Sequence, residues 1–404
     1  MTQKFLYITL FFAATLSCSS SGEKLEVPKK FSKTVGLKES EKEKYRKLLQ
    51  PYYDSLKRTG FSGGIIVAKK GDIILEDYTG YFDWKQKIPI ESNTPLHVAS
   101  VSKTFTAIAM LHFWENEAFH LDDPVQKYFP EFPYKDITIH SLLSHRSGLP
   151  NYANLMTDYT TTVRYVKNKR GKKVPVTTRK KVAPFVEGYV ENKDVLRYFA
   201  VKKPGLVFRP NSRFQYCNSN YVLLALLLEK FSGKPYPQLM KDLIFDPLGM
   251  KDSYIFDKSQ VPNYQPSYFA NLRPYPIDKF DCLYGDKNVY TTARDLLLWE
   301  QGLAQHKIIS PETLSMAYEP QSFEKPGIHN YGLGWRMILY PEKKVIYHNG
   351  WWHGNNAVFT RLVDDNATII ITGNRYNEAI YRFGRRMNNA FFSVSDTTLL
   401  EEMP

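Results

Sequence analysis

The sequence predicts an α+β fold: an antiparallel sheet assembled from both chain ends and flanked by helices, with a mostly helical domain inserted between its two halves. Two observations predict it. Short β-branched, apolar runs separated by turn residues occur near both ends, whereas residues 121–288 lack that pattern and contain helical stretches. We therefore expect a discontinuous sheet domain of residues 40–120 and 289–393 around a helical domain of residues 121–288.

Helices are expected at both ends of the sheet domain. The first covers residues 40–56, with Ser40 as N-cap and a kink at Pro51. The last carries four apolar residues on one face, ahead of a C-terminal tail of residues 394–404: Ile380, Phe383, Met387 and Phe391. Strands are expected at residues 64–68, 73–78, 334–340, 345–348, 357–363 and 367–372.

The composition is that of a globular protein with a basic insertion. Of the 404 residues 43% are hydrophobic, and the formal net charge is +13. The densest basic cluster lies in an insertion of about residues 151–190 and comprises Arg164, Lys167, Lys169, Arg170, Lys172, Lys173, Arg179, Lys180 and Lys181. It has neither a helical apolar stripe nor interleaved aromatic residues, so we expect a solvated surface insertion and no nucleic-acid partner. Contact with anionic envelope polymers or lipid headgroups is the alternative.

The N-terminus has the order of a secretory signal. Lys4 precedes an apolar run at residues 5–16 that is too short to span a bilayer. Cys18 follows in a context similar to the cleavage site of bacterial lipoproteins, where a cysteine becomes the lipidated first residue. We expect a removed signal peptide at 1–17 and a polar, lipidated tether at 18–39, with plain secretion or an uncleaved anchor as alternatives. The protein would then be exported and anchored to a bacterial membrane, facing the periplasm or the exterior.

The first candidate for chemistry is the Ser-x-x-Lys pair Ser100 and Lys103, where a helical stretch of residues 103–117 begins. Residues three apart in a helical turn share a face. An amine there can take the serine proton, and the N–H groups of the turn can bind a developing oxyanion. Alone the pattern is weak, because Ser21 and Ser322 also have a lysine three residues on, and Ser100 could serve only as a helix N-cap.

The second candidate is the Tyr-x-Asn pair Tyr216 and Asn218, directly before an expected helix of residues 220–231. A tyrosine phenolate beside an ammonium can act as a general base, and the Asn218 amide can orient a carbonyl group. Tyr152 and Tyr347 also begin Tyr-x-Asn pairs. The alternative interpretation of Tyr216 is therefore a buried core aromatic.

The third candidate is His348-x-Gly350, where a predicted strand ends in glycine. A strand beside the nucleophile could present a backbone N–H, that of Trp351, as the second oxyanion donor, with His348 pointing into the cleft. A strand-edge histidine without a chemical role is the alternative.

In this order the three motifs resemble the active-site signature of the serine β-lactamase and penicillin-binding protein superfamily. The likeness is closer to its class C β-lactamase branch, which includes D-Ala-D-Ala carboxypeptidases, aminopeptidases and esterases. The sequence segments around the motifs strengthen this resemblance, at residues 142–150, 214–221, 246–250 and 291–296. The resemblance covers about residues 45–393 and implies a β-lactamase/transpeptidase-like fold.

The resemblance implies a serine hydrolase that forms an acyl-enzyme at Ser100. Lys103 would accept or shuttle the hydroxyl proton, and Tyr216 would be the partner base that protonates the leaving group. The N–H groups of Ser100 and Trp351 would form the oxyanion hole. Substrate, a small molecule or peptide with a scissile acyl group, would be bound by Asn218, His348, Gly350 and Trp351. No cofactor or metal is implied.

One departure from the family pattern bears on the substrate. Many β-lactamases carry Lys-Thr-Gly where this chain has His348-Asn349-Gly350, so a permanent cation is replaced by a group that is mostly neutral near pH 7. We therefore expect a peptidase or esterase acting on peptide, amide or ester bonds in the cell envelope, with β-lactam hydrolysis as the alternative. The alternative from another functional class is a non-catalytic one: a penicillin-binding sensor or binding protein that does not turn over substrate.

Metal and cysteine hydrolases are disfavoured. Cys217 lies inside the Tyr-x-Asn motif, and it is expected with Cys282 to be a buried thiol rather than part of a disulfide. The histidine pairs five residues apart form no His-Glu-x-x-His motif: His140 with His145, and His348 with His353.

Overall fold

The structure, a computed structural model, describes residues 36–341 and 343–392. The expected signal peptide, the expected lipidation site Cys18 and the tail of residues 394–404 lie outside these ranges. Within the described ranges, no helix is both long enough and apolar enough to cross a membrane. Cys217 and Cys282 are both buried free thiols.

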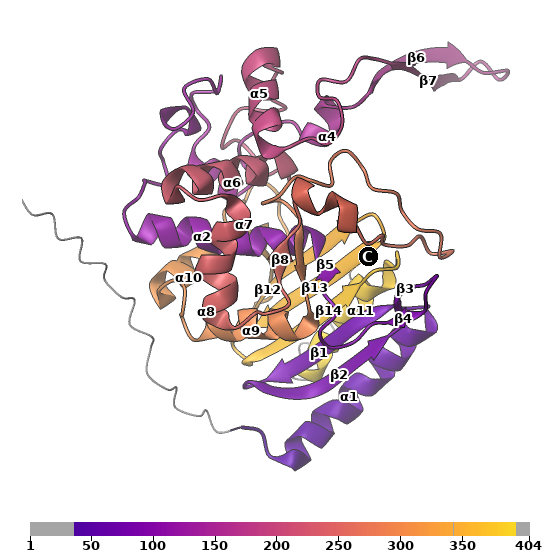
Figure 1. The fold of residues 1–404 in the computed structure, drawn as a ribbon, viewed down its shortest axis with the longest axis vertical. Helices are drawn as coiled ribbons and strands as arrows, with labels where there is room; N and C mark the ends of the chain where they lie inside the picture. Colours follow the sequence, from indigo (N-terminus) through magenta and orange to yellow (C-terminus); the bar gives the residue numbers. More distant parts are fainter. Residues whose placement is uncertain (1–35, 342, 393–404) are drawn as a thin grey trace, which may run out of the picture. The chain divides into compact units, whose positions relative to one another are not determined.

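A seven-stranded antiparallel sheet is built from both ends of the chain, as the sequence predicts (Figure 1). Its N-terminal strands are β1 (Gly63–Lys69) and β2 (Asp72–Thr79). Its C-terminal strands are β10 (His329–Tyr331), β11 (Arg336–Leu339), β12 (Lys344–Trp352), β13 (Asn355–Leu362) and β14 (Ala367–Gly373). The order β10-β11-β12-β13-β14-β1-β2 makes β1 and β14 neighbours, with Gly63 opposite Gly373.

Two helices cover one face of the sheet, α1 (Glu39–Arg58) and α11 (Ala379–Met387), which the turn η5 (Asn388–Ala390) follows. Every residue of β13 and β14 is buried because helices also cover the opposite face. The predicted apolar stripe of the last helix is buried here. The prediction of Ser40 as N-cap is wrong: α1 begins at Glu39, because the Glu41 carboxylate accepts the Lys38 N–H at 3.0 Å and closes the first turn earlier.

The opposite face is covered by α9 (Ala293–Ala304) and by the part of the chain that contains α2 (Ser102–Glu115) and α6 (Asn218–Ser232). Residues 102–111 of α2 are all buried, because this helix lies between the sheet and the other helices. The α6 helix starts two residues earlier than expected and ends at Gly233, whose φ of 68° suits a residue without a side chain.

The remaining elements are short. The helical ones are η1 (Ala99–Val101), η2 (Val125–Lys127), α3 (Ile139–Leu143), α4 (Tyr152–Leu155), α5 (Asn192–Lys202), α7 (Tyr236–Met240), η3 (Lys241–Phe245), α8 (Asp246–Leu248), η4 (Lys258–Asn263) and α10 (Pro311–Ala317). The small sheets pair β3 (Tyr81–Asp83) with β4 (Ile88–Pro89), and β9 (Val289–Thr291) with both β5 (Leu96–His97) and β8 (Tyr254–Ile255).

The basic insertion, expected as a solvated surface insertion in the helical domain, forms a two-stranded hairpin of β6 (Tyr159–Lys167) and β7 (Lys173–Lys181). Both figures show it projecting from the helical part of the molecule. Tyr165 is 70% exposed, so the hairpin is a surface feature.

Candidate active site

Ser100 lies in the tight turn η1, which leads directly into α2. The preceding Ala99 has a φ of 47°, a left-handed conformation that costs a residue with a Cβ about 1 kcal/mol. Neighbouring β9 holds the turn on both sides: the Val98 N–H donates to the Val289 carbonyl at 3.0 Å, and the Ser102 hydroxyl accepts the Val289 N–H at 3.0 Å. The turn is therefore fixed, and Ser100 is half-buried at its tip.

Lys103 is fully buried and contacts Ser100. Its Nζ donates to Ser100 Oγ at 3.0 Å and to the backbone carbonyl of Asp286 at 2.7 Å. The helical spacing that the sequence predicts thus brings the amine to the hydroxyl, and the second hydrogen bond fixes the amine there.

Behind Lys103 lies a buried polar network that the sequence analysis did not identify. The Tyr152 hydroxyl donates to the Asp286 carboxylate at 2.8 Å and accepts from Lys287 Nζ at 2.8 Å. Asp286 and Lys287 are 1% and 2% exposed. This network holds the Asp286 carbonyl in place for Lys103, and no local pattern reveals it because its members come from distant segments.

Tyr216 and Asn218 line the cleft beside Lys103, where α6 begins. The Lys103 Nζ lies 4.9 Å from the centroid of the Tyr216 ring. The Tyr216 hydroxyl and Asn218 Oδ1 are both buried without a hydrogen-bond partner in the described part of the chain. Two unpaired polar atoms in a cleft are available to a ligand.

His145 lies in the segment of residues 142–150 that resembles the family, and it supports the backbone around Tyr216. Its Nδ1 accepts the Cys217 N–H at 3.2 Å, its carbonyl accepts the Gln215 N–H at 2.9 Å, and its ring centroid lies 4.3 Å from that of Tyr216. Burial, reinforced by the charge on Lys103, holds the pKa of His145 well below its usual 6.5. A neutral ring accepts at Nδ1, so His145 positions the tyrosine backbone.

His348 lies buried beneath the cleft rather than among its lining residues. Its Nδ1–H donates to the Asn349 carbonyl at 2.8 Å, which leaves Nε2 to accept from the Tyr331 hydroxyl at 3.3 Å. Its ring centroid is 6.2 Å from that of Tyr216. Burial, followed by the charges of Arg336 and Lys103, keeps the pKa of His348 well below 6.5, so the side chain is neutral.

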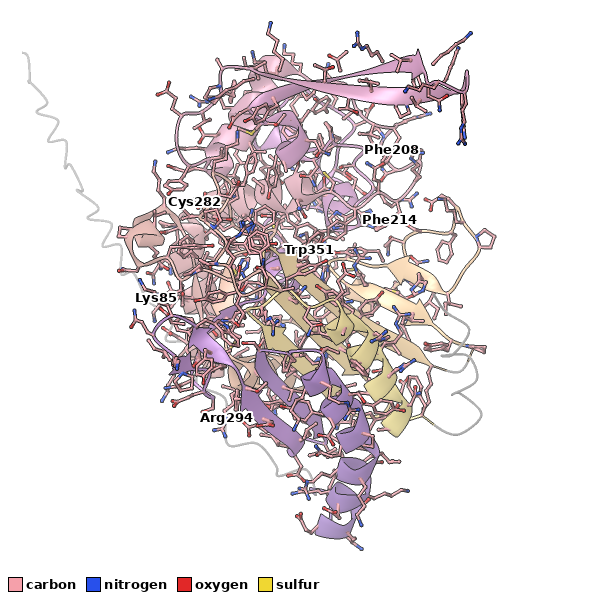
Figure 2. All side chains as sticks on the ribbon, turned by 90° about the vertical axis from the view of Figure 1, so that its right-hand side faces the viewer. Lys85, Phe208, Phe214, Cys282, Arg294 and Trp351 are labelled. Atoms are coloured by element: carbon pink, nitrogen blue, oxygen red, sulfur yellow. The ribbon has the colours of Figure 1, made fainter. Side chains whose placement is uncertain are left out.

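Gly350 brings strand β12 against the Ser100 turn. Pairing with β11 ends at Tyr347, and beyond it the edge of β12 faces η1. A Cβ at position 350 would lie 2.1 Å from the Val98 carbonyl oxygen, so only glycine allows this approach. The neighbouring Trp351 side chain is 62% exposed, and Figure 2 shows it where the sheet meets the helical part.

The cleft has a volume of about 700 Å³. Its lining comprises Ser100, Tyr216, Asn218, Asp278, Phe280, Arg336, Tyr347, Asn349, Gly350, Trp351, Trp352, His353 and Tyr381. A second cavity of about 460 Å³ adjoins it and shares Arg336 and Tyr347. The structure therefore brings all three motifs together around one cleft.

Arg336 is a cleft residue that the sequence analysis missed. Its Cζ lies 4.8 Å from the centroid of the Tyr216 ring, and no carboxylate pairs with it in the described ranges. It comes from β11, and only the pairing of Arg336 with Tyr347 reveals that it lies beside the His-x-Gly strand.

Comparison with known proteins agrees with this geometry. A family model described as Beta-lactamase matches residues 46–390. Penicillin-binding protein 4* of Bacillus subtilis is 28% identical over 358 residues, which cover 84% of this chain and 74% of that protein. Teichoic acid D-alanine hydrolase of Staphylococcus aureus is 25% identical over 352 residues, covering 85% and 77%.

A solved structure extends the likeness to the fold. The penicillin-binding protein from Bacillus halodurans superposes with a TM-score of 0.70 at 22% identity, covering 84% of this chain and 99% of that one. The chain belongs to the beta-lactamase family and is a serine hydrolase of that fold.

Proposed function

We propose that the protein hydrolyses ester, amide or peptide bonds through an acyl-enzyme at Ser100. The contact between the buried Lys103 Nζ and Ser100 Oγ, 3.0 Å long where Ser100 lines the cleft, carries this proposal. A serine hydroxyl becomes nucleophilic when a positioned base takes its proton, and this pair has the required distance.

The proton would move between groups already in place. As Ser100 Oγ attacks the acyl carbon, its proton passes to the Lys103–Tyr216 pair, and Tyr216 then delivers a proton to the departing oxygen or nitrogen. Water, deprotonated by the same pair, releases the acyl group and restores the hydroxyl. The unpaired Tyr216 hydroxyl supports this role, because a proton carrier needs a free position toward the substrate.

The developing oxyanion would be bound by the backbone N–H groups of Ser100 and Trp351. The close approach of Gly350 to the Val98 carbonyl supports this pairing, because it sets the edge of β12 beside the serine turn. Two fixed donors cost no reorganisation during the reaction. Asn218 would hold the acyl side of the substrate through its unpaired amide oxygen.

Arg336 would bind a carboxylate on the leaving-group side. With His348 buried and neutral, the guanidinium of Arg336 is the cation that the cleft offers beside Tyr216. Because Tyr216 protonates the leaving group, an anion held by Arg336 would belong to that group. A peptide C-terminus and the ring carboxylate of a β-lactam both lie on the leaving-group side, so this contact fits either substrate, and the screen below distinguishes them.

We also propose export and attachment to a membrane through a lipid on Cys18. The support is the sequence alone: a charged residue, an apolar run and then Cys18, followed by a polar tether.

A substrate screen tests the proposed activity. Wild-type protein, Ser100→Ala and the control Ser322→Ala, which removes a serine that also precedes a lysine by three residues, are compared on D-alanyl peptides, short-chain esters and a chromogenic cephalosporin. We expect turnover of esters or peptides, lost in Ser100→Ala alone. A single acylation without turnover would instead identify a sensor, and unchanged turnover in Ser100→Ala would remove the proposed nucleophile.

A further inference from the structure

The basic hairpin of β6 and β7 is a formed element with a closed tip and a fixed base. The Asn168 side chain accepts two backbone N–H groups of the turn, each at 3.0 Å. At the base, the Val182 N–H donates to the Asp158 carbonyl at 2.8 Å, and Lys279 pairs with the Asp158 carboxylate. Each strand has nine residues, which correspond to about 30 Å, and both figures show the hairpin extending away from the helices.

Protein covers neither face of this hairpin. No residue of β6 or β7 whose side chain the structure describes is buried. A two-stranded hairpin on its own is marginally stable in water, and the like charges crowded on this one repel each other. A partner that covers the hairpin and neutralises its charge would therefore stabilise it.

The charge of the hairpin has one sign. Residues 159–186 include nine lysines and arginines but no aspartate or glutamate. The described side chains among these cations form no ion pair with other described residues. A surface of one sign without counter-charges attracts a partner of the opposite sign, so the hairpin is suited to an anionic partner.

One face of the hairpin also carries exposed apolar side chains. Alternate residues of a strand share a face, and three of them in β6 are Tyr159, Val163 and Tyr165, whose exposed fractions are 47%, 52% and 70%. Lys167 and Lys173 lie opposite each other on the same face, next to the tip. Tyrosine rings favour the interface between membrane and water, and lysine side chains extend from an apolar surface to headgroups. A soluble polyanion would need only the charges, so the exposed rings favour a membrane.

We propose that this face and the tip of the hairpin bind the surface of a membrane that contains anionic lipids. The lysines and arginines would contact headgroup phosphates, while Tyr159 and Tyr165 would insert their rings at the interface. The inference is independent of the proposed acyl-enzyme, because the lining of the cleft includes no hairpin residue.

This contact would act on the position of the cleft. Lys279, which pairs with Asp158 at the base of the hairpin, lies between the cleft residues Asp278 and Phe280. Binding of the hairpin would therefore hold the cleft near the membrane. Salt screens such a contact, so it would add to a lipid on Cys18 and not replace it.

Vesicle cosedimentation tests the inference, with phosphatidylcholine vesicles that either contain or lack phosphatidylglycerol. The full chain carries Cys18→Ala in every variant, so that no lipid on Cys18 contributes. Residues 1–17 are the same in all variants, and the neutral vesicles measure their contribution. We expect stronger binding to the anionic vesicles, and this difference should shrink as the salt concentration rises.

Two sets of variants separate charge from insertion. Replacing the tip cations Lys169, Arg170 and Lys172 with Gln should weaken binding to anionic vesicles by about fivefold for each charge, or about a hundredfold in all. The matched control replaces the exposed Lys85, Lys87 and Lys251 with Gln and should bind like the parent protein; Figure 2 shows Lys85 away from the hairpin.

Replacing Tyr159 and Tyr165 together with Thr, which keeps the strand propensity, should weaken vesicle binding by about tenfold and leave the binding of soluble polyphosphate unchanged. Phe323→Thr, at an aromatic residue that is 74% exposed elsewhere, is the control and should change neither. Thermal unfolding checks that each variant is folded.

Three results would overturn the inference. The first is equal binding to neutral and anionic vesicles, and the second is an equal effect of the two lysine and arginine sets. The third is full vesicle binding by the double tyrosine variant, or an equal loss of vesicle and polyphosphate binding, since the hairpin would then be a site for soluble polyanions. None of these results bears on turnover that depends on Ser100.

Discussion

Gly350→Ala should damage catalysis more than folding. The added Cβ would lie 2.1 Å from the Val98 carbonyl oxygen, whereas ordinary contact begins at 3.4 Å, so strand and turn must separate by about 1.3 Å. Neither side moves freely: the Val98 N–H is bound to the Val289 carbonyl, and the Gly350 carbonyl accepts the Tyr381 hydroxyl at 2.7 Å. A displacement of about 1 Å at a reacting centre can cost about 10²-fold, as does the loss of one oxyanion donor.

We therefore expect kcat on a chromogenic ester to fall by about 10² to 10³, with a loss of about 1–3 kcal/mol in the free energy of unfolding from overpacking. The control is Gly205→Ala, because a Cβ at position 205 meets nothing within 4 Å. Steady-state kinetics of both variants measure kcat, and thermal unfolding measures the change in stability. A folded Gly350→Ala protein with wild-type turnover would refute the placement of the oxyanion hole at this strand.

Three further predictions follow from the structure and the sequence. Burial lowers the pKa of His97 to about 3 and holds those of His145 and His348 well below 6.5. Below about pH 6.5 these histidines bind protons in the unfolded chain but stay neutral in the folded protein. The free energy of unfolding should therefore fall as the pH falls below about 6.5, by up to about 1.4 kcal/mol per pH unit for each histidine. Urea titrations measure this, and a constant midpoint from pH 7 to pH 5 would contradict it. Tyr216→Phe should lower kcat by about 10² to 10⁴ at an unchanged melting temperature, whereas unchanged turnover would show that Tyr216 only packs. Cys18→Ala should move the protein from the membrane fraction to the soluble one, because acyl chains contribute about 0.8 kcal/mol per buried CH₂; equal membrane association after a carbonate wash would disprove the anchor.

The large sheet is predictable from the sequence because its strands combine β-branched runs with clear turns. Residues 367–372 are an example, since all but Ala367 are β-branched and all are buried. Strands of two or three residues, such as β5 and β9, are too short to show the alternation of a strand, so the sequence does not predict them. The β6–β7 hairpin is not predicted either, although Thr and Val occur on both sides of a turn at Gly171, because its dense positive charge indicates only a solvated surface insertion.

The order of the three motifs predicts that Ser100, Tyr216 and the His-x-Gly strand share a cleft, but His348, expected to point into it, lies buried beneath it. The residues that support them are not visible in the sequence, because strand pairing and burial bring them there. Arg336 reaches the cleft through its pairing with Tyr347, and Asp286 reaches Lys103 only through its backbone carbonyl. The place of His145 beside the Tyr216 ring likewise depends on tertiary packing, which no spacing along the chain reveals.

Covalent labelling with a fluorophosphonate tests the central claim most directly. The adduct should map by mass spectrometry to Ser100, and Ser100→Ala should abolish it. Ser322 is the internal control: it also precedes a lysine by three residues, but its hydroxyl accepts from Arg146 at 2.8 Å, and we expect no label there. Lys103→Ala should slow the labelling of Ser100, because the hydroxyl loses the amine that contacts it. An adduct at another residue, or full labelling of Ser100→Ala, would contradict the account.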